Sequence, residues 1–191
     1  MAALEGSAAH ADADYVKLRE EHGFGLIELL IAMVILNIGL LALVAAFQSS
    51  AFALRRASHI STAATLADTQ MELYRGLTYA QIVLDPTLLA GVDNTYKCDG
   101  ALGTSCPNST AAEQTGSCVG PPEACNPSRL VTNYGDRYGY RVDTYIVLVT
   151  TSNGSATGRA EKKVTVVVRD KSRLGKTLAR ATSTFDQTIS G

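Results

Sequence analysis

LLIAMVILNIGLLALVAAF, the stretch from Leu29 to Phe47, is the part of the sequence that decides the architecture of the chain. Seventeen of its 19 side chains are apolar, and only Asn37 and Gly39 interrupt them. A helix over residues 24–47 would be about 36 Å long at about 1.5 Å per residue, which is enough to cross a hydrocarbon core of about 30 Å. We therefore expect a membrane-spanning helix. On hydropathy alone, a plain single-pass anchor or an uncleaved signal sequence fits equally well.

Outside this stretch the composition is that of an ordinary soluble domain. The 191 residues allow one domain, or one domain with an appendage. The formal net charge of -1 argues against a dedicated nucleic-acid-binding protein, which would usually be strongly basic. With 46% hydrophobic and 18% charged residues, the chain is too apolar for a disordered protein.

One carboxylate does not fit a plain membrane anchor. Glu28 lies near the start of the apolar stretch, and no basic residue follows it within a helical turn or two. A charged carboxylate in hydrocarbon costs at least about 2.5–3.5 kcal/mol on insertion scales. Glu28 is therefore a candidate functional residue that requires a positively charged partner.

The residues around Glu28 resemble a known signal. The run Gly23-Phe24-Gly25-Leu26-Ile27-Glu28 is similar to the class III signal of type IV prepilins and type II secretion pseudopilins. The resemblance implies that residues 1–23 are a cytoplasmic leader. It also implies that a prepilin peptidase cleaves between Gly23 and Phe24 and then methylates the new amine of Phe24. In this reading Glu28 pairs with that amine, as the assembly residue of the family.

The same resemblance implies a structural role and a set of partners. These are the prepilin peptidase and methyltransferase, other pilin subunits, the assembly platform and the membrane. The chain would be a single-pass protein of the bacterial inner membrane and then part of a cell-surface filament. Many major pilins carry a helix-breaking proline in the apolar half, but no proline occurs here between Phe24 and Asp85. Its absence favours a minor pilin or a pseudopilin. A minor pseudopilin of a type II secretion system, and a membrane-anchored binding module that never assembles, remain as alternatives.

The helix is expected to continue beyond the membrane. Apolar residues recur at helical spacing after Phe47, and residues 48–84 contain no proline. We predict one helix over residues 24–80, with an apolar assembly half at 24–47 and an amphipathic half at 48–80. The alternative is two helices with a break near residues 48–50.

Residues 85–135 are predicted to be a loop within an extracytoplasmic region at 81–191. All five prolines and all four cysteines lie in this segment. Four cysteines allow three pairings, and we expect local pairs, since small loops cost the least chain entropy. Disulfides indicate an oxidising exterior. No Cys-x2-Cys pair is present, so we expect no metal site. The expected pairs are Cys98–Cys106 and Cys118–Cys125.

Residues 137–186 are predicted to form an antiparallel sheet with strands at 140–150, 160–169 and 178–185, because these runs are rich in β-branched and aromatic residues. Three such strands can pack on a helix. The predicted fold class is therefore α+β and pilin-like: a long N-terminal helical spine packed against a small antiparallel sheet, with a disulfide-bearing loop.

The sequence also bears on two other functions, DNA binding and catalysis. Residues 129–180 hold eleven Lys and Arg against four acidic residues, a balance of 11 - 4 = +7. This basic segment makes DNA a minor candidate partner. The three histidines lie in no nucleophile or metal motif, so we expect neither an enzyme nor a cofactor. They are His10, His22 and His59.

Overall fold

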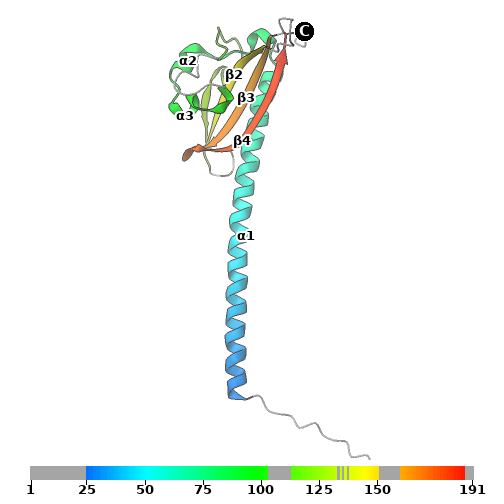
Figure 1. Ribbon diagram of the computed structural model, residues 1–191, viewed down its shortest axis with the longest axis vertical. Coiled ribbons are helices and arrows are strands. Elements are labelled where there is room, and N and C mark those ends of the chain that lie inside the picture. The colour runs from blue at the N-terminus through cyan, green and yellow to red at the C-terminus, as the bar shows by residue number, and fades with distance from the viewer. Residues whose placement is uncertain are drawn as a thin grey trace, which may run out of the picture. The chain divides into compact units, whose positions relative to one another are not determined.

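The first element of the structure is the long helix α1, Leu26–Arg75. A computed structural model describes residues 25–102, 113–132, 134, 136, 138–150 and 160–187. The chain divides into two units, Met1–Gln48 and Ser49–Gly191, and each is described by itself. Helix α1 is continuous through residues 48–50, so the chain does not break there (Figure 1).

Helix α1 ends at Arg75, whereas the sequence pattern extends to about residue 80. The chain instead forms a single 3₁₀ turn, η1, at Tyr79–Gln81. The Lys162 ammonium donates hydrogen bonds to the carbonyls of Tyr79 and Ile82, both over 2.8 Å. Lys162 comes from a distant strand, so a tertiary contact fixes this turn where local helical spacing would have continued the helix.

The second unit is built on a four-stranded antiparallel sheet in the order β1-β2-β3-β4. Its strands are β1 (Ser128–Val131), β2 (Tyr140–Thr150), β3 (Ala160–Asp170) and β4 (Arg173–Asp186). The two central strands agree closely with the prediction. Strand β4 begins five residues earlier than expected (178 - 173 = 5), because its pairing with β3 continues to Asp170 through a register shift. Strand β1 was not predicted at all.

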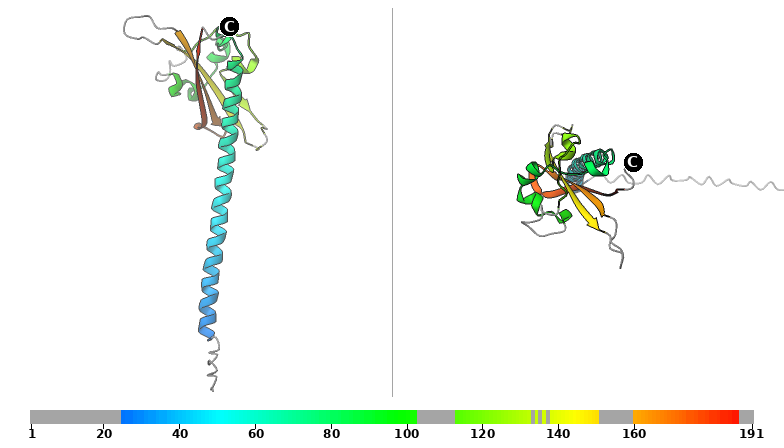
Figure 2. Two further views of the ribbon diagram at one scale, coloured as in Figure 1. Left: turned by 90° about the vertical axis from the view of Figure 1, so that its right-hand side faces the viewer. Right: turned by 90° about the horizontal axis from the view of Figure 1, so that it is seen from above.

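One face of the sheet packs against the last turns of α1. Alanines at positions 63 and 67 let the helix approach the sheet closely, and both are fully or almost fully buried. Figure 2 shows this part of α1 on one side of the strands. The even-numbered residues of β2 and β3 point to this face, as expected from the period of two in a strand. The shared core includes Leu66, Met71, Tyr74, Tyr140, Val142, Ile146, Val164, Val166 and Val168.

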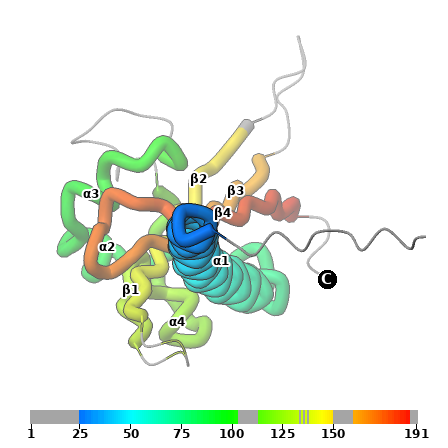
Figure 3. The backbone as a smooth tube through the Cα atoms, turned by 90° about the horizontal axis from the view of Figure 1, so that it is seen from below, coloured from blue at the N-terminus to red at the C-terminus, as the bar shows by residue number. Residues whose placement is uncertain are grey.

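The other face is covered by three short elements: α2 (Pro86–Ala90), α3 (Asn94–Lys97) and the 3₁₀ turn η2 (Gly100–Leu102). Seen along α1, they lie across the sheet from the helix (Figure 3). Asp85 and Asp93 cap the helices by accepting backbone N–H bonds at 2.8 and 3.0 Å. The ring of Tyr96 stacks on that of Tyr145 with a centroid distance of 4.3 Å.

Within the described part of residues 85–135, the predicted loop contains several short regular elements. Besides α2 and α3, it contains the helix α4, Pro122–Cys125, and the strand β1. Each of these elements has only four or five residues. Such short elements carry no periodic signal in the sequence, and it is tertiary packing that stabilises them.

Candidate functional site

The residues that resemble the processing signal lie at the start of α1. Gly23 and Phe24 are outside the described residues, and the description begins at Gly25. The Gly25 carbonyl accepts the N–H groups of Glu28 and Leu29 at 2.9 and 3.2 Å, which forms the first turn of the helix. Glu28 lies in this turn and is exposed. A carboxylate at a helix N-terminus interacts favourably with the macrodipole, and Glu28 forms no ion pair with another described residue.

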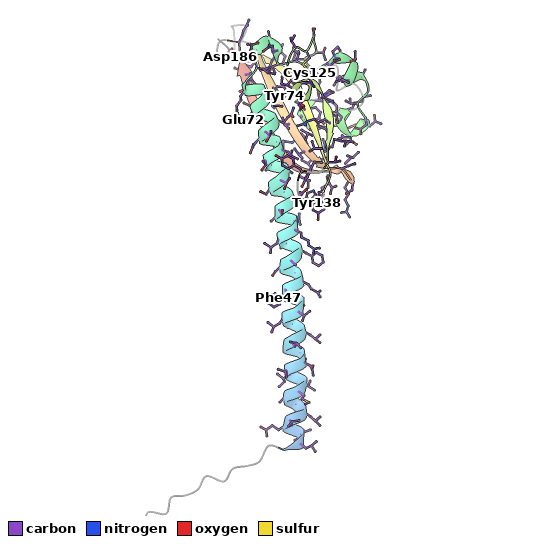
Figure 4. The ribbon with its side chains drawn as sticks, turned by 180° about the vertical axis from the view of Figure 1, so that it is seen from behind. Phe47, Glu72, Tyr74, Cys125, Tyr138 and Asp186 are labelled. Carbon is purple, nitrogen blue, oxygen red and sulfur yellow. A yellow bond between two sulfur atoms is a disulfide. The ribbon has the colours of Figure 1, made fainter. Side chains whose placement is uncertain are left out.

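The helix that follows Glu28 is apolar on all sides and is uncovered within its own unit. Every residue from 25 to 48 is exposed, including Ile35 at 64% and Phe47 at 75%. The side chains around Phe47 stand away from the helix in Figure 4. Asn37 turns its amide back to donate to the Met33 carbonyl at 2.9 Å, so its polar group is satisfied inside the helix. By length and composition this helix is able to cross a membrane.

The disulfide-bearing segment is held on the second half of α1. Cys118 and Cys125 form a disulfide with a Cα–Cα distance of 5.7 Å, as predicted. The Gln70 amide donates to the Glu123 carbonyl at 2.8 Å, and the Tyr74 hydroxyl donates to the Ala124 carbonyl at 2.6 Å. Tyr74 and Cys125 are labelled in Figure 4. Because these bonds join α1 to α4, the disulfide loop has a fixed position on the helix.

The other predicted disulfide is only partly described. Cys98 is itself disulfide-bonded and lies at the C-terminal end of α3. Its expected partner, Cys106, lies outside the described residues. The bond between Cys118 and Cys125 leaves neither residue with a thiolate that could ligate zinc.

A buried network of ion pairs lies between the sheet and the α3 segment. Asp143 is fully buried, and its Oδ2 accepts hydrogen bonds from Arg141 Nε at 3.0 Å and from Arg169 Nε at 2.8 Å. Arg169 also pairs with Asp99, whose Oδ1 accepts from Arg180 at 2.8 Å. Burial alone would raise the pKa of Asp99, but the N–H of the 3₁₀ turn and the two guanidiniums hold it below its usual value. The network fixes the segment around Cys98 to the sheet.

A second buried carboxyl group has no positively charged partner among the described residues. Glu113 is 6% exposed, and its Oε1 lies 2.7 Å from the Tyr96 hydroxyl, which is 2.5 Å from the Thr144 carbonyl. Burial raises the pKa of Glu113 to about 8. A tyrosine hydroxyl has one proton and can satisfy only one acceptor. We infer that neutral Glu113 donates to Tyr96, and that Tyr96 donates to Thr144.

These buried acids were not predicted from the sequence. One signal was available for the first network: Arg141 and Asp143 are two apart in a predicted strand, so they lie on one face between apolar neighbours. No comparable signal marks Asp99 or Glu113, because both lie in segments without a period.

The network also reduces the number of basic side chains in residues 129–180 that could contact DNA. Arg141 and Arg169 are nearly fully buried in ion pairs, and Lys162 is buried against backbone carbonyls. Burial lowers the pKa of Lys162. These three charges are not available to a phosphate backbone. Those that remain exposed in the described part of the segment include Lys163, Lys171, Arg173, Lys176 and Arg180.

Comparison with known protein families identifies the N-terminal segment. Residues 18–44 match the prokaryotic N-terminal methylation motif. Comparison with curated proteins and with solved structures gave no match. The matched residues include Gly23, Phe24 and Glu28 and most of the apolar stretch, through residue 44. This chain therefore carries the prokaryotic N-terminal methylation motif, the class III signal that is typical of type IV pilins and type II pseudopilins.

Proposed function

We propose that the chain is a structural, non-enzymatic subunit of a type IV pilus or related filament, and more narrowly a minor pilin. The observation that carries this proposal is the methylation motif followed by a helix that is apolar on all sides. Such a helix must be covered by lipid or by other helices. The motif implies that a prepilin peptidase processes the chain. Other pilin subunits and the assembly platform are the further partners that we propose.

Assembly would exchange one apolar environment for another. In the precursor, residues 24–47 lie in the inner membrane, with the leader in the cytoplasm and the C-terminal region outside. The disulfide in the second unit supports this orientation, since disulfides persist in oxidising compartments. In the filament the same side chains pack against neighbouring helices. Leaving the bilayer then costs little hydrophobic free energy, because the apolar surface stays buried.

Cleavage after Gly23 would supply the missing partner of Glu28. The new α-amine on Phe24 has an unperturbed pKa of about 7.7–8.0 and is largely charged at neutral pH. We propose that this amine pairs with the Glu28 carboxylate of a neighbouring subunit. Removing one member of a buried ion pair is costly even where the pair adds little net stability. Glu28 would therefore set the register between packed helices.

The proposal is tested by intact-mass and N-terminal peptide mass spectrometry of the protein from its native membrane. We expect a chain that begins at N-methylated Phe24. A chain that begins at Met1 or Ala2, in cells with an active prepilin peptidase, would contradict processing at Gly23. The anchored binding module would then be the better description.

A minor pseudopilin of a type II secretion system would share the methylation motif, the apolar helix and the disulfide. It differs in the genes expected nearby, which would encode a type II secretion system in place of a pilus machinery. DNA remains a weaker candidate partner. Equal binding of DNA at physiological salt by the full chain and by a charge-matched control protein would exclude a specific role for the basic residues.

A further inference from the structure

Strand β1 forms one edge of the sheet. Its hydrogen-bond pattern follows from the pair of residues that directly precedes it, Pro127 and Thr144. The Thr144 N–H donates to the Pro127 carbonyl at 2.8 Å, and these two residues lie opposite each other in the β1–β2 register. Hydrogen-bonded and non-hydrogen-bonded pairs alternate along an antiparallel ladder. The residues of β1 therefore alternate between bonding to β2 and facing away from the sheet.

The residues that face away are Ser128 and Leu130, whereas Arg129 and Val131 bond to β2. Asn126 Oδ1 accepts the Ser128 N–H at 3.0 Å, so this donor is already satisfied. No described residue accepts the Leu130 N–H, and the outward carbonyls of Ser128 and Leu130 are likewise without a described donor. This edge thus presents one donor and two acceptors to an incoming chain.

A groove of about 680 Å³ runs beside this edge on the face of the sheet that carries α2. We call it the edge groove. Its apolar lining comes from α2 and the residues after it, from β1, and from the start of β4. Leu130 is 59% exposed and Leu88 is 45% exposed, so apolar side chains in this groove are only half covered by the chain itself. The apolar residues are Leu88, Val92, Leu130 and Leu174.

The charges of the edge groove are not balanced. Asp93 and Arg141 both line it, but they are paired with each other. Arg141 is also bonded to Asp143. Lys171 is exposed and forms no ion pair with a described residue. It is therefore the charge in the groove that is free to meet an acidic group.

Lys171 lies at a defined end of the groove. Val131 and Asp170 both pair with Tyr140, from opposite sides of β2, so the β3–β4 turn lies at the Val131 end of β1. Helix α2 and Asn126 lie at the other end. The four residues of β1 span roughly 13 Å at about 3.3 Å per residue, which matches a short extended peptide.

We propose that the edge groove binds an extended peptide segment that adds to β1 as a further strand, with alternate apolar side chains in the groove and an acidic side chain at the Lys171 end. Strand addition obtains affinity from main-chain hydrogen bonds and specificity from the pockets that receive alternate side chains. The other edge, β4, is longer but carries Arg173, Lys176 and Arg180, and charged side chains oppose strand pairing. This binding does not depend on whether the chain assembles into a filament.

The experiment uses fluorescence anisotropy with the full chain in uncharged detergent micelles. The probe is a labelled, end-blocked heptapeptide, Glu-Thr-Val-Thr-Val-Thr-Glu, whose valines and glutamates share one face. One version is N-methylated at its valines and a second at its threonines. The N–H groups on one edge of a strand belong to alternate residues, so only one methylated version should lose binding. Empty micelles control for partition of the label.

Variants locate the binding. Leu130→Pro removes the outward donor and leaves the β1–β2 ladder intact, and it should weaken binding about tenfold. Leu88→Glu places a like charge in the groove without touching β1, and it should weaken binding at least as much. Val119→Glu is the matched control, because Val119 is 76% exposed outside the groove. Thr184→Pro is the second control, since it removes an outward donor on β4.

The proposal is supported if binding is saturable and is lost with one methylated peptide, with Leu130→Pro and with Leu88→Glu. Both control variants should keep the binding. Binding that is equal for both methylated peptides, or unchanged in Leu88→Glu, overturns it. The absence of saturable binding up to about 1 mM peptide, the weak end of specific association, overturns it too. None of these results depends on N-terminal processing, so they are distinct from a failure of the proposed filament role.

Discussion

Two buried carboxyl groups in this protein differ because of what surrounds them. Asp143 lies between two guanidinium groups and accepts charge-assisted hydrogen bonds from both. Glu113 faces a tyrosine hydroxyl and a backbone N–H, at 2.7 and 3.4 Å, and burial raises its pKa to about 8. The first belongs to an ion-pair network, and the second is a neutral hydrogen-bond donor at neutral pH.

Glu113→Gln should remove a pH dependence of stability. The usual pKa of a glutamate is 4.5, and that of folded Glu113 is about 8. Between these values the folded state binds the proton more tightly. The stabilisation is therefore complete below pH 4.5 and is lost as the pH rises through 8, by up to about 5 kcal/mol. Glutamine keeps a neutral donor at every pH, so the variant should be the more stable protein at pH 9.

This prediction is measured by urea unfolding of the full chain in detergent micelles at pH 5 and pH 9. Seven of the eight tyrosines lie between residues 74 and 145, so tyrosine fluorescence reports on the second unit. The control is Glu123→Gln, which changes an exposed glutamate. If the free energy of unfolding changed equally with pH in the wild type and in Glu113→Gln, Glu113 would be ionised in the folded protein, and the prediction would be wrong.

Asp143→Asn should be strongly destabilising. The change keeps the shape of the side chain but leaves Arg141 and Arg169 buried with one fewer negative charge. Breaking a buried ion pair from one side costs about 3–5 kcal/mol. Removing the charge of the exposed Glu72, which pairs with Arg75, should cost less than about 1 kcal/mol. The comparison is again urea unfolding, and similar losses in Asp143→Asn and Glu72→Gln would contradict the network.

At the scale of elements, β1 shows how a four-residue strand is specified. Its position follows from bonds at either side: the Pro127 carbonyl accepts from Thr144, and Ser128 donates its hydroxyl to Asp143 at 2.6 Å. Arg129 donates to Gln70 of α1 at 3.0 Å. Three bonds to two elements, β2 and α1, therefore fix a strand that has too few residues to form from its own propensity.

Proline should have effects of very different size at two adjacent positions of β1. Val131 donates its N–H to β2, so Val131→Pro removes a ladder bond and should destabilise the second unit by about 3 kcal/mol. Leu130 points its N–H away from the sheet, where proline is tolerated, and Leu130→Pro should cost about 1 kcal/mol or less. Urea unfolding of both variants tests the assigned alternation, and the reverse order would mean that the register is shifted by one residue.

At the scale of the whole molecule, the two units have different surfaces. Residues 25–48 expose apolar side chains throughout, whereas the unit from Ser49 onward buries a core of its own between α1, the sheet and the short helices. The first surface is suited to lipid or to other helices, and the second unit folds around its own contacts. A change in the first unit should therefore affect assembly and leave the second unit intact.

Glu28→Leu tests this separation. We expect normal processing at Gly23, because the glycine and Phe24 are unchanged, but poor incorporation into filaments, because the N-terminal amine loses its carboxylate partner. Processing is followed by mass spectrometry of the membrane fraction, and incorporation by the amount of the chain in sheared filaments. Leu29→Ile, an apolar change at the adjacent position, is the control. Incorporation of Glu28→Leu at the wild-type level would refute this role of Glu28.

The sequence by itself determined the features that depend on local pattern. A run of 17 apolar residues in 19 specifies an uncovered helix, because lipid or other helices must satisfy every face. The motif from Gly23 to Glu28 is a linear pattern of neighbouring residues, so its identification needs no folded context. The two central strands and the Cys118–Cys125 disulfide also follow from short-range pattern and spacing.

Only the tertiary structure decided the rest. The 3₁₀ turn that follows α1 is held by Lys162, and the short elements within residues 85–131 depend on the sheet that they cover. The buried roles of Asp99 and Glu113 depend on partners 70 and 33 positions away in the sequence. Such contacts leave no period in the sequence, since their energy comes from groups that meet only once the chain has folded.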